Sequence, residues 1–187
     1  MKRFALVMLL FCTSTANAAD TVGVADTKMP LDVKASQARF SVKHILIERV
    51  SGSIPIVSAD IEVGADGLTP TSVDATLDPS RIDTGDSDRD GALTGSDWFD
   101  TKRFPLWTFK SDRIIANPDK TYSISGTLTI HGVGIPVTLA TVLVRKAPYP
   151  LYHATTIVDR HAFGMVVTRT DPLIGNDVAI DLDIQAK

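Results

Sequence analysis

The stretch Thr121–Ile130, TYSISGTLTI, decides the fold class, because polar and apolar side chains alternate along it, with one glycine in an apolar place. Tyr122, Ile124 and Leu128 share one face of an extended strand, and the serines and threonines share the other. A strand of this kind needs one enclosed and one solvated side, which favours an antiparallel sheet over a parallel one. The stretch therefore predicts an all-β protein.

The same alternation recurs on both sides of this stretch. It is clear at residues 137–143 and 178–185, and weaker at residues 40–44, 61–63 and 73–77. Turn signals separate the runs at Asp66-Gly67, Asn117-Pro118-Asp119 and His131-Gly132. Many short strands favour a barrel or a sandwich, and periodicity alone does not choose between the two.

Residues 83–100 break the alternation and predict a short helix around residues 90–96. They also contain an acidic pattern over Asp86–Asp97, in which the carboxylates, a glycine and a leucine fall where an EF-hand calcium loop has them: Asp86, Asp88, Asp90, Gly91, Leu93 and Asp97. Against calcium binding, Asp97 replaces the longer bidentate glutamate, and no long helix flanks the loop. The favoured interpretation is a solvated acidic loop that caps a helix, and a calcium-binding module is the first alternative function.

The N-terminus has the three parts of a secretory signal peptide. Lys2 and Arg3 give a positive start, residues 4–11 form an apolar run too short to span a bilayer, and residues 16–18 fit the A-x-A cleavage pattern. We expect residues 1–18 to be removed, residues 19–30 to form a flexible lead, and residues 31–187 to form one domain. The expected location is the periplasm.

Composition excludes several classes of partner. The chain has 19 basic and 22 acidic residues, which gives no reason to expect nucleic acid as a partner. No second apolar stretch is long enough for stable membrane insertion. The single cysteine, Cys12, lies in the expected signal peptide, so the mature chain has no disulfide, no thiol nucleophile and no thiolate metal site.

An ordered series of motifs resembles the YceI-like family. The first group is Ser80–Gly85, Arg89-Asp90, Ser96–Asp100, Phe104-Pro105 and Thr108–Ser111. The later motifs are Leu128–Val133 with Pro136-Val137, then Asp159-Arg160 with Phe163-Gly164-Met165, and finally Asp177-Val178. The resemblance extends from about residue 31 to residue 186.

The resemblance implies a lipocalin-like, extended antiparallel barrel of eight strands with a short helical insertion. It also implies a periplasmic carrier, not an enzyme, that holds a polyisoprenoid or fatty-acyl amphiphile in an apolar tunnel without a cofactor. A barrel of this size either fills its interior with side chains or holds one small ligand. That the interior is hollow is implied by the resemblance alone. Which lipid binds, and whether the barrel forms a homodimer, stay open.

Strand parity and the family motifs together select the candidate ligand site. The residues expected to line or close the tunnel are Phe40, Val42, Leu77, Phe99, Phe109, Tyr122, Ile124, Leu128, Phe163, Met165, Val178, Ile180 and Leu182. The candidates for contact with a polar headgroup are His44, which shares the parity of Phe40 and Val42, and Arg160. Trp98, Phe99, Phe104, Trp107 and Phe109 form a dense aromatic cluster, which is either an end cap or the rim or floor of the tunnel.

Catalytic and metal motifs are absent from the sequence. The four histidines show no H-x-H or H-E-x-x-H spacing, so no metal site is predicted. There is no G-x-S-x-G motif and no phosphate-binding glycine loop. A hydrolase whose site is assembled from distant residues is the second alternative function.

Overall fold

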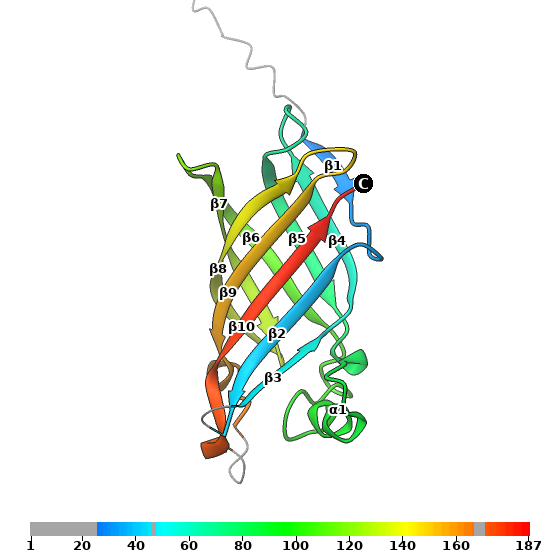
Figure 1. Ribbon diagram of the computed structural model, residues 1–187, viewed down its shortest axis with the longest axis vertical. Helices are drawn as coiled ribbons and strands as arrows, with labels where there is room; N and C mark the ends of the chain where they lie inside the picture. Colours follow the sequence, from blue (N-terminus) through cyan, green and yellow to red (C-terminus); the bar gives the residue numbers. More distant parts are fainter. Residues whose placement is uncertain (1–25, 46–47, 167–170) are drawn as a thin grey trace, which may run out of the picture.

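The computed structural model describes residues 26–45, 48–166 and 171–187 as one curled antiparallel sheet with a short α-helix at one end (Figure 1). The strands are β1 (Thr27–Pro30), β2 (Gln37–His44), β3 (Glu48–Ser53), β4 (Ile56–Val63), β5 (Pro70–Leu77), β6 (Trp107–Ala116), β7 (Thr121–Ile130), β8 (Val133–Arg145), β9 (Leu151–Asp159) and β10 (Ile174–Gln185). The helices are α1 (Ser87–Thr94) and the 3-10 turns η1 (Pro79–Arg81), η2 (Arg160–Phe163) and η3 (Asp171–Leu173).

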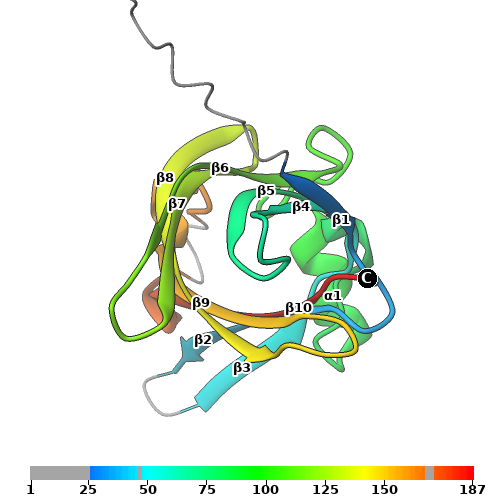
Figure 2. The ribbon, with the colours of Figure 1, turned by 90° about the horizontal axis from the view of Figure 1, so that it is seen from above.

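The sheet closes into a barrel, which Figure 2 shows from above as a ring of strands. Its hydrogen-bonded order is β1-β4-β5-β6-β7-β8-β9-β10-β2-β3. Closure is completed by β3, which leads directly into β4, and by a bridge between Leu31 and Ala186 that joins the end of β1 to the end of β10. All neighbouring strands are antiparallel, as the alternation predicts.

The barrel has ten strands where eight were expected, because two long strands are each interrupted once. β1 and β2 lie along the same path, with β1 pairing to β4 and β2 pairing to β3. Between β3 and β4, Ile54 still donates from its backbone to the Ala38 carbonyl at 3.0 Å, but Pro55 has no N–H to donate. The family resemblance therefore gives the correct path of the chain and miscounts the strands.

The N-terminal boundary also differs from expectation. Residues 19–30 were expected to form a loose lead, but Thr27–Pro30 form β1, which pairs with β4 from Thr27 opposite Val63 to Pro30 opposite Asp60. The expected signal peptide and residues 19–25 lie outside the described residues.

The helical insertion begins earlier than predicted. α1 spans Ser87–Thr94 and not residues 90–96, because the Asp86 side chain caps it by accepting backbone hydrogen bonds from Asp88 and Arg89, both at 3.1 Å. These bonds, first of all that from Arg89, lower the pKa of the Asp86 carboxyl. None of the helices in the described ranges is long and apolar enough to cross a bilayer.

At the end of the barrel that is uppermost in Figure 1, apolar side chains form a packed cluster. Ile61, Val63 and Ala186 are almost completely buried there, and Tyr152 is 4 % exposed. The Tyr152 hydroxyl donates to the Leu68 carbonyl in the loop between β4 and β5 at 2.8 Å. In Figure 2 this loop lies over the interior of the ring. Burial raises the pKa of the Tyr152 phenol to about 12, so the hydroxyl stays a donor in this bond. The buried cluster and the loop held by Tyr152 together close this end of the barrel.

Candidate ligand-binding cavity

The lower part of the barrel is hollow. Phe40 and Val42 on β2, and Val178, Ile180 and Leu182 on β10, point inward by parity but are only half-buried. In a filled core such side chains would be fully covered. They face a cavity of about 420 Å³, which is the size range of small-molecule sites.

Most of the predicted site residues line this cavity. The structure brings together Phe40, Val42, Leu77, Phe99, Phe109, Leu128, Met165, Val178, Ile180 and Leu182, with both headgroup candidates, His44 and Arg160.

Three predicted residues lie elsewhere. Ile124 is 4 % exposed and Phe163 is 1 % exposed, and both belong to the packed core beside the cavity. Tyr122 packs against the same core. Parity places Tyr122 and Ile124 correctly on the inner face of β7, but these two residues lie toward the closed end of the barrel. The cavity is bounded on this strand by Leu128 and Ile130, toward the other end.

Other lining residues were not selected from the sequence. Five of them could have been selected from the alternation, because each stands on the apolar side of an alternating stretch: Val73, Ala75, Val137, Leu139 and Ile184. Ile54 and Arg89 could not have been selected in this way, because Ile54 precedes a proline at a strand break and Arg89 lies on a short helix.

The aromatic cluster combines the two roles considered for it. Trp98, Phe99, Trp107 and Phe109 all line the cavity. Phe99 and Trp107 pack edge to face, with ring centroids 4.7 Å apart. Phe104 instead packs on the ring of His131 at 4.7 Å. The cluster therefore forms one wall of the cavity on the side of α1, with Phe104 outside it.

The cavity reaches the surface at the end where α1 lies. His44 at the end of β2, Ile174 at the start of β10, and Arg89 and Ala92 on α1 all line it, and Ala92 is exposed to solvent. Arg89 is held in place by Thr84, whose hydroxyl accepts from Arg89 Nε at 2.9 Å and whose carbonyl accepts from Nη2 at 3.1 Å. His44 Nδ1 lies 3.7 Å from a Glu48 carboxylate oxygen. His44 and Arg89 thus bring polar groups to the open end, while Arg39 and Thr156 are polar lining residues farther from this end along the barrel.

Arg160 holds together the chain segments that form this open end. It is 3 % exposed, and its guanidinium donates to the carbonyls of Met165, Ile174 and Gly175 at 2.6, 3.0 and 3.0 Å. Its charged carbon lies 5.7 Å from the centre of the Trp98 ring. Arg160 therefore ties the segment after η2 to the start of β10, and it brings a buried positive charge to the wall of the cavity.

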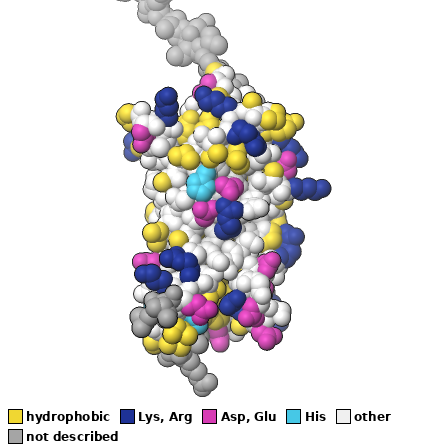
Figure 3. Space-filling model, in the orientation of Figure 1, with side chains coloured by type: hydrophobic (Ala, Val, Ile, Leu, Met, Phe, Trp, Pro, Cys, Tyr) yellow, Lys and Arg dark blue, Asp and Glu magenta, His cyan; other side chains and the backbone are white. Residues whose placement is uncertain are grey.

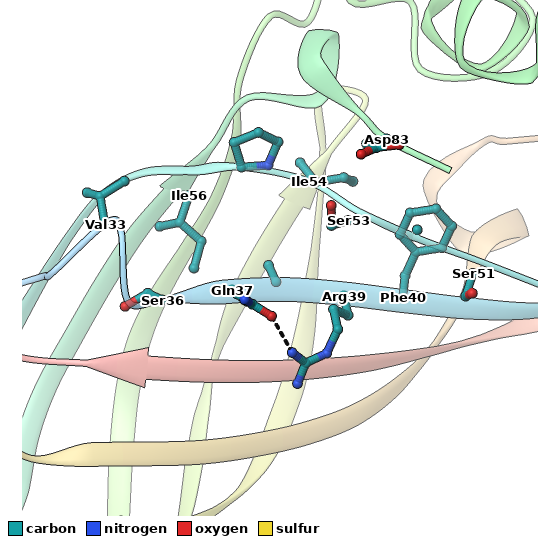
Figure 4. Close-up of a pocket in the computed structure, with 13 residues that line it drawn as sticks. Val33, Ser36, Gln37, Arg39, Phe40, Ser51, Ser53, Ile54, Ile56 and Asp83 are labelled. Atoms are coloured by element: carbon teal, nitrogen blue, oxygen red, sulfur yellow. Dashed lines mark hydrogen bonds between the residues drawn. The ribbon is translucent and has the colours of Figure 1, made fainter. Parts of the chain in front are cut away.

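A second hollow of about 550 Å³ lies at the break between the β1–β4 pair and the β2–β3 pair (Figure 4). Its lining is mixed, with Gln37 and Arg39 joined by a hydrogen bond on β2 and with Ser51 and Ser53 on β3. Some residues line both this groove and the inner cavity: Ala38, Arg39, Phe40, Ile54 and Ile56. These shared residues therefore form the wall that separates the second hollow from the inner cavity.

The acidic pattern does not form a calcium loop. Asp88 and Asp90 lie on α1, Asp86 is occupied as its cap, and Asp90 accepts from the Thr84 backbone and hydroxyl at 3.0 and 2.6 Å. Helical backbone separates carboxylates that a calcium loop would converge on one ion.

Within the described ranges, the group with metal-ligand spacing is His153, Asp181 and Asp183, on the outer face of the barrel. Arg39 Nη2 lies 2.5 Å from Asp181 and 2.6 Å from Asp183, so a guanidinium already stands where a cation would bind. Three of the four histidines give the hydrolase hypothesis no support. His44, His131 and His153 contact Glu48, the Phe163 carbonyl and the two aspartates, and none of these three is paired with a serine.

The fold and the cavity together define a lipocalin-like antiparallel barrel that encloses an apolar site. The family model described as the YceI-like domain matches residues 30–186, and the chain belongs to this family. A UPF0312 protein of Vibrio vulnificus is 24 % identical over 97 % of this chain and 93 % of its own length. A UPF0312 protein of Staphylococcus epidermidis is 32 % identical over 57 % of this chain and 59 % of its own length.

Two solved structures share the fold at low identity. BcnA of Burkholderia cenocepacia superposes with a TM-score of 0.77 at 23 % identity, covering 84 % of this chain and 99 % of BcnA. A polyisoprenoid binding domain from Saccharophagus degradans, implicated in plant cell wall breakdown, superposes with a TM-score of 0.62 at 14 % identity, covering 87 % of this chain and 99 % of that domain.

Proposed function

We propose that the protein is a carrier that binds one long-chain amphiphile, of the polyisoprenoid or fatty-acyl type, with its chain inside the barrel. The observation that carries this proposal is the cavity of about 420 Å³, whose wall is almost entirely aliphatic and aromatic. Such a wall favours a ligand with little hydrogen-bonding capacity along its length. The polyisoprenoid binding domain of the same fold supports this class of ligand.

Burial of the chain supplies the affinity. Each buried methylene contributes about 0.8 kcal/mol, so about a dozen give on the order of 10 kcal/mol before the cost of immobilising the ligand. A polar end is best placed near His44 and Arg89, which are half-buried and lie where the cavity meets solvent. The apolar chain of the ligand therefore enters first, and its polar end remains in contact with solvent.

We place this carrier in the periplasm. The proposal rests on the signal-peptide pattern of residues 1–18, which lie outside the described residues.

A matched pair of tryptophan substitutions tests the binding site. Ile180→Trp adds volume into the cavity, so the protein should fold, and its affinity for a dansyl-labelled fatty acid should fall about tenfold or more. Ile124→Trp places the same bulk in packed core and should destabilise the protein by roughly 1–3 kcal/mol through overpacking. Fluorescence titration and urea unfolding separate the two effects.

Solvent extraction and mass spectrometry of protein purified without detergent complete the test. We expect a co-purifying isoprenoid or acyl chain, at reduced occupancy in Ile180→Trp. If wild-type protein yields no extractable chain and does not bind the dansyl probe, and Ile180→Trp unfolds as Ile124→Trp does, the cavity is not a lipid site.

A further inference from the structure

Three large apolar side chains are exposed together at the open end of the cavity. Ile45 is 49 % exposed, Val166 is 54 % exposed and Leu173 is 48 % exposed. The Ile45 backbone N–H donates to the Leu173 carbonyl at 2.7 Å, so these two residues are neighbours in space. We call Ile45, Val166 and Leu173 the apolar rim. Figure 3 shows hydrophobic side chains gathered at this lower end of the molecule, where β2 ends and β10 begins in Figure 1.

The apolar rim lies next to the wall of the cavity along the chain. Each rim residue directly adjoins a lining residue in the chain, as Ile45 follows His44, Val166 follows Met165 and Leu173 precedes Ile174. The position is also built into the fold. His44 pairs with Ile174 in the sheet, and the Arg160 guanidinium binds the carbonyls of both Met165 and Ile174.

Basic side chains stand beside the rim. Lys43 and Arg49 are opposite each other in the β2–β3 hairpin and both are exposed, and Arg49 is steadied by a 3.1 Å bond from its Nη1 to the Ser41 hydroxyl. Glu48 on the same hairpin is near His44. Exposed cations thus flank the apolar rim on the β2–β3 side, away from the acidic start of α1, and this side matches a surface of anionic lipid headgroups over hydrocarbon.

We propose that the apolar rim docks on an anionic lipid bilayer, so that cargo passes between the bilayer and the cavity without crossing water. This inference rests on the proposed function, because it is an insoluble cargo that makes direct transfer necessary. A long apolar chain has a very low concentration in water, so a carrier that waited for free ligand would fill slowly. A rim beside the mouth of the cavity gives the chain a short apolar path from the membrane to the site.

The test measures transfer of a pyrene-labelled fatty acid between vesicles of phosphatidylcholine and phosphatidylglycerol in equal parts. The triple variant Ile45→Ser, Val166→Ser and Leu173→Ser should transfer roughly tenfold more slowly, because apolar area no longer enters the interface. The matched control is the double variant Val144→Ser and Ile157→Ser, which removes exposed apolar side chains from the outer barrel wall and should leave the rate unchanged. Lys43→Glu with Arg49→Glu should slow transfer from these vesicles and have little effect with phosphatidylcholine alone.

Binding of the same probe without vesicles separates this inference from the proposed function. We expect wild type and triple variant to bind it equally, with the same melting temperature. Equal binding with equal transfer rates would overturn membrane docking and leave the carrier function standing. A protein that binds no probe would overturn the carrier function itself. A wild type that is dimeric, with a monomeric triple variant and unchanged transfer, would show that the rim is covered by a second copy and would also overturn the proposal.

Discussion

Gly126 in β7 is a place where the barrel needs the absence of a side chain. A Cβ atom there would lie 2.3 Å from the Lys110 carbonyl oxygen and 2.8 Å from both the Phe109 ring and the Ser111 Cα. Two of these three contacts are to backbone atoms of β6, which cannot move without breaking the sheet, and Phe109 lines the cavity. The close approach of β6 and β7 therefore depends on this glycine.

We predict opposite effects for two glycine-to-alanine substitutions. Gly126→Ala should destabilise the protein by roughly 1–3 kcal/mol, because the new methyl group overlaps the neighbouring strand. Gly91→Ala, inside α1 and with open space around the new Cβ, should stabilise it by about 0.5–1 kcal/mol through helix propensity. Urea unfolding of the two variants and wild type measures both. Equal destabilisation would show that backbone contact at Gly126 is not the cause.

The sequence predicts which side chains of the site point inward, but not how far along the barrel axis each one lies. Alternation in Thr121–Ile130 places Ile124 and Leu128 on the same inner face, and the structure agrees. Which of them meets the cavity depends on how far along the barrel axis the packing of the upper end extends. That extent is set by Tyr152 and by the loop after β4, which are distant from β7 in sequence. A period of two carries no information about such distant packing.

At the scale of elements, a row of charged side chains joins β2, β10 and β9 across the outer wall. Arg39 on β2 contacts Asp181 and Asp183 on β10, and His153 Nδ1 on β9 lies 2.9 Å from Asp183. The hydrogen bond from His153, followed by that from Arg39, lowers the pKa of the Asp183 carboxyl. The charged form of Asp183 therefore contributes to stability in the folded protein.

This contribution has a defined pH dependence. A carboxyl whose folded-state pKa lies below its unfolded value of about 3.9 stabilises the protein above that value and loses its effect as the pH falls through the folded-state pKa. Because these groups are partly exposed, Asp183→Asn should cost only about 0.5–1 kcal/mol at neutral pH, and the difference from wild type should vanish in strong acid. Thermal unfolding across the acid range measures this, with Asp177→Asn on the same strand as the control. A cost that persists unchanged in strong acid would rule out the charge as its origin.

The elements themselves were largely predictable, and the exceptions have local causes. The alternating stretches and turn signals locate the strands, and the break in alternation locates α1. The helix starts early because the Asp86 side chain caps it, which agrees with the interpretation of this acidic loop as helix-capping. The breaks at residues 31–36 and at Pro55 have no alternation to mark them in the sequence. Only the pairing shows that β1 and β2 follow one path beside β10, and that β3 and β4 follow one path beside them.

At the scale of the whole molecule, the sequence predicts export, and the signal peptide that would direct it lies outside the described residues. We predict that the periplasmic fraction of an expressing bacterium contains protein that begins at Ala19 or Asp20, by N-terminal mass spectrometry. Ala18→Arg should block cleavage, because the site requires a small residue, and leave unprocessed protein with the membrane fraction. Full-length wild-type protein found only in the cytoplasm would contradict export.

The closed upper end of the barrel would give the proposed cargo a fixed polarity. With the loop after β4 bound to Tyr152, a chain has one way in and must leave by the same way, in the reverse order. The tail that enters first is the last part to come out, and a chain longer than the cavity leaves its surplus protruding beside α1. A receptor for the proposed cargo would therefore always contact the same chemical end of the chain first.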